Sequence, residues 1–389
     1  MNMIRCLLAA KILFCLTSCS TTTEENHTDI VTIDLDQSQE GRFTELFERL
    51  EYILLDSDDS NPLVHPYNFS FEDGQIIVND LSRDVLFFFD EKGRILKTIN
   101  PSGKGPGEYF QMDGHQITDQ FIYIQDTYLY KTLKFDHDGN LLSEIKNNFN
   151  NTEFYHNDTY SLYFLSYSPD FDGHHFIKKN HHTGETKSYL PIAKDLIGLG
   201  KSRAINGFVP IKDDGLAFAL PNSTNVVFFT ESTGDLIKAI HFDFGKHQMD
   251  DQKRWMGRHE LNTYLDDNNL VEDISFFFQL EKSYIMRVAQ GGSNRHILIM
   301  DEALNVIKQW KNMDNDINGI NLSIPWTSTS EDMIFLKRSS DIYNDYLATY
   351  AGKKVAIEKH SIHDFFDSHK EKLKEDKWVI VKAKYKKMF

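Results

Sequence analysis

Two histidine pairs are the first residues of this 389-residue chain whose type and spacing could do chemistry. His174-His175 and His181-His182 fall on neighbouring segments of expected strand, and imidazole nitrogens are common zinc ligands. Adjacent residues on a strand point to opposite faces, so neither pair can hold one ion with both rings. His360 and His363 have helical i, i+3 spacing beside Asp364, which a surface helix explains equally well. We therefore predict no metal site and no cofactor.

Carboxylates and a glycine-rich loop are the next candidates. Asp80 and Asp126 each stand ten residues before a second aspartate, at matching positions of a repeat. Such a carboxylate either caps a turn or lies at a channel mouth. Loop 103–107 lacks the Lys-Ser or Lys-Thr of a phosphate-binding loop and leads into no clear helix. No Gly-x-Ser-x-Gly motif occurs, so we predict no catalytic residue from local motifs, whereas a site assembled across repeats stays open.

The amino terminus has the pattern of a cleaved leader. Arg5 is followed by an apolar stretch at 6–16, which Lys11 interrupts, and then by Leu16-Thr17-Ser18-Cys19. Small residues before a cysteine, after an apolar run, resemble the bacterial lipobox. The resemblance implies a signal peptide at 1–18, lipidation of Cys19 and a polar tether at 19–30. Residue 20 is Ser rather than Asp, which resembles the outer-membrane sorting pattern of Gram-negative lipoproteins.

Cysteine usage and charge exclude several classes of function. Cys6, Cys15 and Cys19 all lie in or at the end of the leader, so the mature domain has no disulfide, thiolate nucleophile or cysteine ligand. Removal of residues 1–18 takes away two positive charges and changes the net charge of the chain from −16 to −18. This charge excludes a protein that is basic overall, as nucleic-acid-binding proteins commonly are. Hydrophobic residues make up 40% of the chain, enough for a core, but no apolar run reaches membrane-spanning length.

The body of the chain repeats one unit: an apolar strand, an acid, a glycine-containing turn and a second strand. The turn glycines Gly93, Gly139, Gly184 and Gly234 are 46, 45 and 50 residues apart. Each unit has room for two further strands before this hairpin. Five units supply four strands each, with starts near 67, 114, 154, 208 and 273.

A sixth unit, starting near 323, supplies only three strands, and a strand at 50–56 is left over. The leftover strand would complete the last unit and cover its exposed edge. We therefore predict an all-β fold over residues 31–389: a six-bladed β-propeller closed by an N-terminal strand. The stretches 245–272 and 341–377 interrupt the pattern and are predicted to be insertions with short helices.

The leader, the tether, the repeats, the loop Gly103–Tyr109 and the closing strand 379–382 together resemble a known family. They are similar to the six-bladed β-propeller lipoproteins of Bacteroidetes, relatives of NHL-repeat propellers. The resemblance spans nearly the whole chain, and the Gly-Pro-Gly-Glu-Tyr loop is its most specific part. It implies a propeller fold and a place at the cell envelope, as an outer-membrane lipoprotein, far more than it implies an activity.

The alternating direction of the strands predicts which face of the propeller binds a ligand. Turns between strands 1 and 2, and between 3 and 4, share one face, and the other connections share the opposite face. The long segments 101–113, 193–207, 245–272 and 341–377 are all of the second class. We call this the elaborated face and its opposite the trimmed face. Long loops on a rigid scaffold commonly bind ligands, so we predict contact residues at Tyr109, Tyr128, Trp255 and Tyr264, with Tyr343, Tyr346 and Tyr350 on the same face.

Three functions fit the sequence. The first is a lipid-anchored envelope module that binds a glycan, a peptide or a partner protein, with the membrane as the site of its anchor. The alternative is an envelope hydrolase or lyase with a metal or carboxylate and histidine site at the axis; the third is a scaffold subunit. Residues 353–389 hold 11 Lys against 6 acids, so contact with anionic head groups or an acidic polymer is also open. Convergent acids and histidines would favour the enzyme, whereas an aromatic-lined mouth would favour binding.

Overall fold

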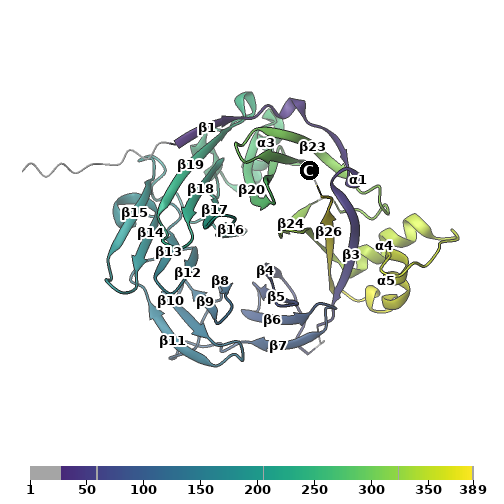
Figure 1. Cartoon of the computed structure of the whole chain (residues 1–389), viewed down its shortest axis with the longest axis horizontal. Helices are drawn as coiled ribbons and strands as arrows, with labels where there is room; N and C mark the ends of the chain where they lie inside the picture. Colours follow the sequence, from purple (N-terminus) through teal and green to yellow (C-terminus); the bar gives the residue numbers. More distant parts are fainter. Residues whose placement is uncertain (1–27, 58–59, 205, 323, 388–389) are drawn as a thin grey trace, which may run out of the picture.

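The computed structural model describes residues 28–387, except 58–59, 205 and 323. In this part of the chain, six sheets surround a central axis like the blades of a propeller (Figure 1). The predicted all-β six-bladed propeller is confirmed. The predicted leader 1–18 and Cys19 lie outside the described residues, as do tether residues 19–27, whereas residues 28–30 belong to a strand.

Blades 1 to 3 each contain four antiparallel strands, ordered from the axis outward. Blade 1 comprises β4 (Pro66–Glu72), β5 (Gln75–Asp80), β6 (Val85–Asp90) and β7 (Ile95–Ile99). Blade 2 comprises β8 (Gly114–Ile117), β9 (Ile122–Asp126), β10 (Lys131–Phe135) and β11 (Leu141–Lys146). Blade 3 comprises β12 (Glu153–His156), β13 (Tyr160–Phe164), β14 (His174–Asn180) and β15 (Thr186–Pro191).

Blades 4 to 6 follow the same order. Blade 4 comprises β16 (Val209–Ile211), β17 (Gly215–Ala219), β18 (Asn225–Thr230) and β19 (Leu236–Asp243). Blade 5 comprises β20 (Val271–Leu280), β21 (Ser283–Gln290), β22 (Asn294–Asp301) and β23 (Val306–Asp314). Blade 6 comprises β24 (Pro325–Ser328), β25 (Asp332–Arg338) and β26 (Trp378–Tyr385), with β3 (Phe47–Leu55) as its outermost strand.

The core lies between neighbouring blades, because the second and third strands of a blade are covered on both sides. In β6, Phe87 and Phe89 pack with Ile334 and Ile380 of blade 6. Phe88, which alternates with them, packs with residues of blade 2. Successive side chains of a strand point to opposite faces, so a continuous apolar run is what a doubly covered strand requires. The runs visible in the sequence are thus explained by burial between two blades.

The ring closes as the sequence predicts. Strand β3 pairs antiparallel with β26, with Ile53 opposite Ile380, so the last blade takes its outer strand from the start of the chain. The Asp56 N–H donates to the Gly93 carbonyl of blade 1 at 2.8 Å, which ties the closing strand to the next blade. Lys377 pairs with the Asp56 carboxylate at 2.7 Å.

Two N-terminal strands were not expected from the sequence. β1 (Thr28–Thr32) runs parallel to β19 as a fifth strand of blade 4, and β2 (Gln39–Arg42) runs parallel to β23 as a fifth strand of blade 5. The N-terminal segment, purple in Figure 1, therefore passes around the outside of the ring before it becomes β3. Short helical turns connect these strands: η1 (Leu35–Gln37) and α1 (Phe43–Leu46).

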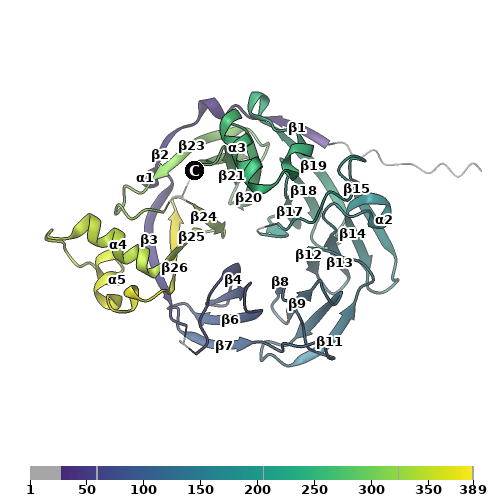
Figure 2. The same cartoon turned by 180° about the vertical axis from the view of Figure 1, so that it is seen from behind.

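The insertions contain the predicted helices. Between blades 4 and 5 lie η2 (Gly245–His247), η3 (Asp251–Trp255) and α3 (Arg258–Asn268), which Figure 2 shows from the rear. Between β25 and β26 lie α4 (Ser339–Tyr350), α5 (Ile362–His369) and η4 (Lys372–Lys374). A further turn, α2 (Asp170–Gly173), precedes β14. No helix in the described part of the chain is long and apolar enough to cross a membrane.

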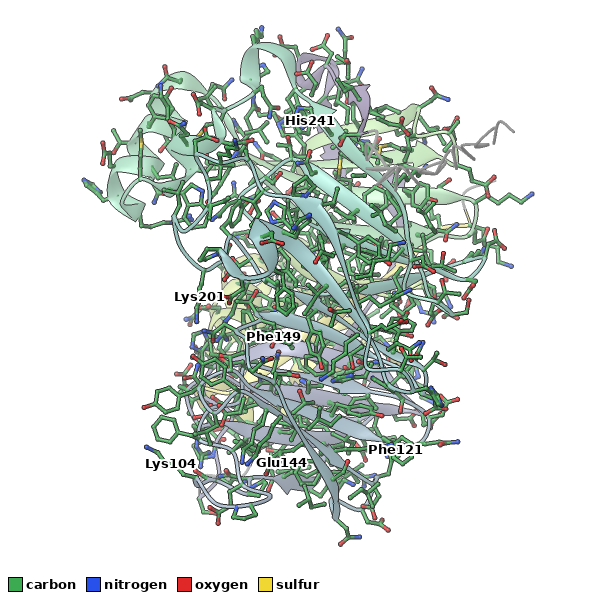
Figure 3. The ribbon with its side chains drawn as sticks, turned by 90° about the vertical axis from the view of Figure 1, so that its left-hand side faces the viewer. Lys104, Phe121, Glu144, Phe149, Lys201 and His241 are labelled. Atoms are coloured by element: carbon green, nitrogen blue, oxygen red, sulfur yellow. The ribbon has the colours of Figure 1, made fainter. Side chains whose placement is uncertain are left out.

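The strand order makes all four long segments start and end at one face, as predicted, although helices α4 and α5 of segment 341–377 extend beyond the rim beside β3 (Figure 1). Three of them link consecutive blades and the fourth joins strands 2 and 3 of blade 6. Figure 3, a side view, shows Lys104 and Lys201 of these segments on one side of the disc and Phe121, from a turn between strands 1 and 2, on the other. The elaborated and trimmed faces are therefore real features of the molecule.

We predict that Gly93→Ala destabilises the ring far more than Gly74→Ala. Both glycines have positive φ, at +77° and +71°, so both replacements carry the left-handed strain of about 1–2 kcal/mol. A Cβ at Gly93 would also lie 2.0 Å from the Leu54 carbonyl oxygen of β3, whereas a Cβ at Gly74 meets nothing within 4 Å. Urea unfolding should show an additional loss of about 2–3 kcal/mol for Gly93→Ala. Equal losses would contradict close contact at the closure.

Candidate functional site

A cavity of about 490 Å³ lies among the innermost strands at the propeller axis. Its wall takes residues from all six blades, and each inner strand runs from the elaborated face toward the trimmed face. The lining includes Glu72, Ile117 and Gln279 near the trimmed ends of their strands, and the turn residues Thr329 and Ser330. The cavity therefore reaches the trimmed face, where the short turns leave it uncovered.

The cavity wall is largely aromatic. It contains Tyr67, Phe69 and Phe71 of blade 1 and one aromatic side chain from each of blades 3 to 6: Tyr155, Phe208, Phe278 and Trp326.

Ring contacts and hydrogen bonds hold these aromatic side chains in place. The Phe69 ring lies 6.4 Å from Trp326 in a T-shaped contact, and the Trp326 indole N–H donates to the Tyr67 carbonyl at 2.7 Å. The Tyr155 hydroxyl donates to Glu231 at 2.8 Å. Because the rings are fixed before any ligand arrives, the cavity is preorganised to bind one.

Ser70 and His115, from adjacent blades, are the closest approach to a catalytic pair in this wall. The Ser70 Oγ lies 3.1 Å from the His115 Nε2, within the reach of a nucleophile and its base. The His115 Nδ1 has no partner in the described part of the chain, so no carboxylate orients the ring. Burial lowers the pKa of His115 to about 4, which makes it a weak base at neutral pH.

The elaborated-face end of the axis holds buried charges. The Arg203 guanidinium pairs with Asp113, whose side chain is fully buried just before β8. Nearby, burial raises the pKa of Glu153 well above its usual range, and a single N–H from Ala204 opposes this shift. The second carboxyl oxygen of Glu153 has no partner in the described residues, which further favours the protonated form of this carboxyl. Burial together with Glu153 raises the pKa of Tyr67 to about 12.

The motifs that drew attention in the sequence have structural roles. Asp80 accepts N–H bonds from Val64 at 2.5 Å and Ser82 at 3.0 Å, and Asp126 accepts from Phe110 at 2.6 Å and Leu129 at 2.7 Å, so both cap turns. Of the histidine pairs, His175 bonds the Ser166 carbonyl at 2.9 Å and His181 bonds Ser161 at 2.7 Å. His363 contacts the Tyr346 hydroxyl at 3.1 Å. Within the described residues, no three His, Cys, Asp or Glu side chains could hold a metal ion.

Of the four predicted contact residues, Tyr109 is ruled out by burial, and Trp255 and Tyr264 are half-buried. Tyr109 is 0% exposed and its hydroxyl donates to the Asp84 and Ile99 carbonyls, at 2.6 and 3.2 Å, so it packs the loop and offers no surface to a ligand. Trp255 is half-buried in an edge contact with Tyr167, 4.8 Å between centroids. The Tyr264 hydroxyl accepts from Lys253 at 2.8 Å. Tyr109 thus fastens its loop to blades 1 and 2, whereas Trp255 and Tyr264 pack among the long connections themselves.

Tyr128 is the exception among the four. It is 56% exposed, and its ring lies 4.7 Å from that of Phe110, which is also exposed. The Lys104 ammonium stands 4.3 Å from the Phe110 centroid. This small aromatic patch faces solvent on the elaborated face, and none of its residues belongs to the described lining of the axial cavity. The predicted residues thus do not converge, and the aromatic wall at the axis was missed.

A signal for that wall does exist in the sequence. Phe69 and Phe71 alternate along the first strand of unit one, which is the innermost strand of a propeller blade. Tyr155, Phe208, Phe278 and Trp326 stand in or near the first strands of later units. Treating the first strand of each unit as the wall of a channel would have found them together.

The sequence model of a family described as 6-bladed beta-propeller matches residues 21–336. The chain belongs to this six-bladed β-propeller family. A Bacteroides fragilis protein described as exported is similar in structure, with a TM-score of 0.67 and 14% identity over 92% of this chain and 100% of that one. A Bacteroides vulgatus protein of another uncharacterised family gives a TM-score of 0.50 and 11% identity over 88% and 97%. At these identities the likeness shows the fold alone, and no curated protein matches the chain.

We predict that Glu153→Gln flattens the pH dependence of stability. The folded state of this propeller keeps a proton on Glu153 that the unfolded chain releases above pH 4.5, the ordinary pKa of the group. The unfolding free energy of the wild type therefore falls as pH rises from 4.5 toward the folded pKa, by up to about 1.4 kcal/mol per unit from this group. The variant should match the wild type at pH 4 and exceed it at pH 7 in urea unfolding.

The matched control is Glu91→Gln, which removes a carboxyl from an exposed turn. It should leave the wild-type pH profile unchanged. Parallel stability curves for wild type and Glu153→Gln across pH 4 to 7 would show that Glu153 is ionised in the folded protein.

Proposed function

We propose that this propeller is a lipid-anchored binding module of the cell envelope and that its ligand site is the axial cavity. The observation that carries the proposal is the aromatic wall built from residues of blades 1 and 3 to 6, open at the trimmed face. Preformed cavities of 300–1,000 Å³ lined by aromatic groups with a few polar atoms are the usual form of ligand sites, and 490 Å³ falls in that range.

The polar groups of the wall support recognition better than catalysis. Gln116 is fixed by two bonds to the His156 backbone, at 2.9 and 2.7 Å. The described lining contains one carboxylate, Glu72, and it stands exposed at the mouth. A group that orients a ligand needs a fixed position, whereas a general acid or base needs a matched pKa beside the reacting atom. The wall provides the first more clearly than the second.

A hydrolase is the second candidate, and one observation favours it. The Ser70 and His115 contact of 3.1 Å is the spacing of a nucleophile and base. It lacks an orienting carboxylate among the described residues, and the lowered pKa of His115 weakens the base. Ser70→Ala separates the candidates: it should leave ligand binding intact, whereas it would abolish turnover in a serine hydrolase.

We predict that ligands of this propeller lose affinity in Phe71→Ala and keep it in Tyr128→Ala. The ring closes within residues 28–387, so the chain from Ser20 to Phe389 holds every described element of the fold. A thermal-shift screen of that chain against peptides, oligosaccharides and amines should give compounds that raise its melting temperature. For these compounds, Phe71→Ala should weaken binding about tenfold or more, because it removes a ring from the cavity wall.

Tyr128→Ala is the matched control, since it removes an exposed ring from the opposite face. Loss of binding in Tyr128→Ala with full binding in Phe71→Ala would move the site to the elaborated face. Circular dichroism of both variants checks that the change in affinity does not come from unfolding.

The membrane anchor is supported by the sequence pattern alone. Leu16-Thr17-Ser18-Cys19 resembles a lipobox, and eight residues separate Cys19 from Thr28, the first residue of β1. Fully extended, such a spacer spans about 30 Å. A diacylated cysteine would hold the propeller close to a bilayer, at the outer membrane in our proposal.

We predict that Cys19→Ser abolishes incorporation of an alkynyl fatty acid and releases the protein from the membrane fraction of the expressing bacterium. Cys15→Ser, in the leader, is the matched control and should leave both properties unchanged, since residues 1–18 are removed in this proposal. Labelling that persists in Cys19→Ser, or that is lost in Cys15→Ser, would contradict the assignment. The readout is in-gel fluorescence with membrane fractionation.

A further inference from the structure

We propose that the axial cavity takes a cation: a ligand that carries a primary ammonium or guanidinium group on an apolar stem. The inference rests on the proposed function and names the chemical class of its ligand. It depends on two independent features, the charge around the mouth of the cavity and the composition of its wall.

Carboxylates surround the mouth of the cavity on the trimmed face. The connection between strands 1 and 2, which is the turn nearest the axis, carries at least one acid in each of the six blades. We call these residues, together with Glu72 at the end of β4, the acidic ring. Its members are all exposed: Glu72, Asp73, Asp119, Asp158, Asp213, Asp214, Glu281 and Glu331. The same connections contain two lysines, Lys212 and Lys282.

Ion pairs neutralise little of this ring. Three lysines beside it line a hollow on one side together with Glu281 and Glu331: Lys384, Lys386 and Lys387. Within the described part of the chain, the ion pair of Glu331 with Lys384 at 3.6 Å is the one that involves a member of the ring. Burial, Asp73 and Asp119 together raise the pKa of Glu72, so carboxylates of neighbouring blades repel one another across the mouth. An arriving cation would relieve this repulsion, and clustered charge of one sign at a cleft raises the rate of encounter with the opposite charge.

Turn geometry alone does not require these charges. Asp73, Asp213, Asp214 and Glu281 have positive φ, a conformation that Gly, Asn and Asp adopt most readily. Asn or Gly would satisfy this backbone conformation at Asp73 and Asp213 without charge, and Glu has no preference for it. The Asp214 carboxylate differs, because it also accepts from the Ser232 N–H at 2.7 Å. Asp119, Asp158 and Glu331 are not among the residues with positive φ, so the charge there has no such explanation.

The wall beneath the ring suits a cation and does not suit an anion. No Lys or Arg side chain belongs to the described lining, so no positive group would neutralise a phosphate or a carboxylate. Aromatic rings attract cations at their faces, and the Lys382 ammonium already lies 5.7 Å from the centroid of the Phe71 ring. The rings of Phe69 and Trp326 add two further aromatic groups to the same wall. The Asn68 amide oxygen in the same wall is buried without a hydrogen-bond partner, so an acceptor for an N–H donor is already in place.

Two kinds of molecule carry such a cationic group on an apolar stem. A lysine or arginine side chain of a peptide could enter the cavity, or a free aliphatic amine could do so. Both present N–H donors and a positive charge at the end of an apolar stem, which would lie against the rings. The choice between them is made by the experiment.

The test measures binding of four probes to the chain from Ser20 to Phe389: spermidine, tetralysine, tetraglutamate and maltotriose. Isothermal titration at about 20 mM and about 200 mM salt gives affinities at two screening lengths. We expect tetralysine or spermidine to bind, with affinity falling at higher salt, and the other two probes to be silent. Binding of tetralysine alone indicates a peptide, and comparable binding of spermidine indicates a free amine.

A charge-matched pair of variants separates the acidic ring from general attraction. The triple variant Glu72→Gln, Asp73→Asn, Asp119→Asn removes three carboxylates at the mouth, and Asn tolerates the positive φ at Asp73. The control Glu91→Gln, Asp138→Asn, Glu302→Gln removes three exposed carboxylates from turns between strands 3 and 4, farther from the axis. The first should weaken cation binding about tenfold or more and the second less than about twofold.

Three results would overturn the inference: equal loss in the two triple variants, binding of tetraglutamate or maltotriose in place of the cations, or no cation binding at either salt concentration. If other compounds then bind and lose affinity in Phe71→Ala, the cavity stays a ligand site and only the cation assignment fails. Ligands that are insensitive to Phe71→Ala would instead refute the proposed site itself.

Discussion

The antiparallel pairing of β3 with β26 is the constraint on which the positions of all six inner strands depend. Eight residue pairs, from Trp378 opposite Leu55 to Tyr385 opposite Phe47, join the two ends of the chain. Without β3, the outer edge of β26 would expose its backbone groups, and blades 6 and 1 would share fewer contacts. Because each inner strand is held by the strands outside it and by the inner strands of the neighbouring blades, the shape of the axial cavity depends on this closure.

The closing strand β3 packs against the blades on both sides of it. Tyr52 and Leu54 of β3 belong to a core shared with blade 5, whereas Ile53 and Leu55 belong to one shared with blade 1. The single closing strand therefore contributes to two of the cores between blades. The N-terminal segment adds further contacts on its way, since β1 and β2 extend blades 4 and 5 before β3 begins. The segment from β1 to β3 thus contributes the outermost strand to three consecutive blades.

The sequence predicted the fold well because the signals were local and repeated. Gly93, Gly139, Gly184 and Gly234 mark one turn in each of the first four units, and each has positive φ in the structure. The closing strand was predicted because one strand, at 50–56, remained unassigned after the six units had been counted. β1 and β2 were missed because they are short and exposed, and parallel pairing to a distant strand leaves no turn or apolar alternation in the sequence.

The site was predicted less well, for a physical reason. Tyr109 stands in a long loop, and loop position was taken as a sign of exposure, but its ring fills a gap between blades 1 and 2. Whether an aromatic residue binds a ligand or fastens a loop depends on what packs against it, which spacing does not reveal. Position relative to the axis is more informative, because every first strand of a unit must face the same channel.

The two faces of the disc then differ in how much of the molecule is free to meet a ligand. On the elaborated face, long segments are fastened by buried side chains such as Tyr109 and by ion pairs such as that of Arg203 with Asp113. On the trimmed face the turns are too short to cover the cavity, and their carboxylates stay in solvent. Packed loops stabilise the ring from one side and leave the other side open, so the proposed ligand site lies at the face without long loops. A long loop can therefore mark the supporting face of a scaffold rather than its binding face.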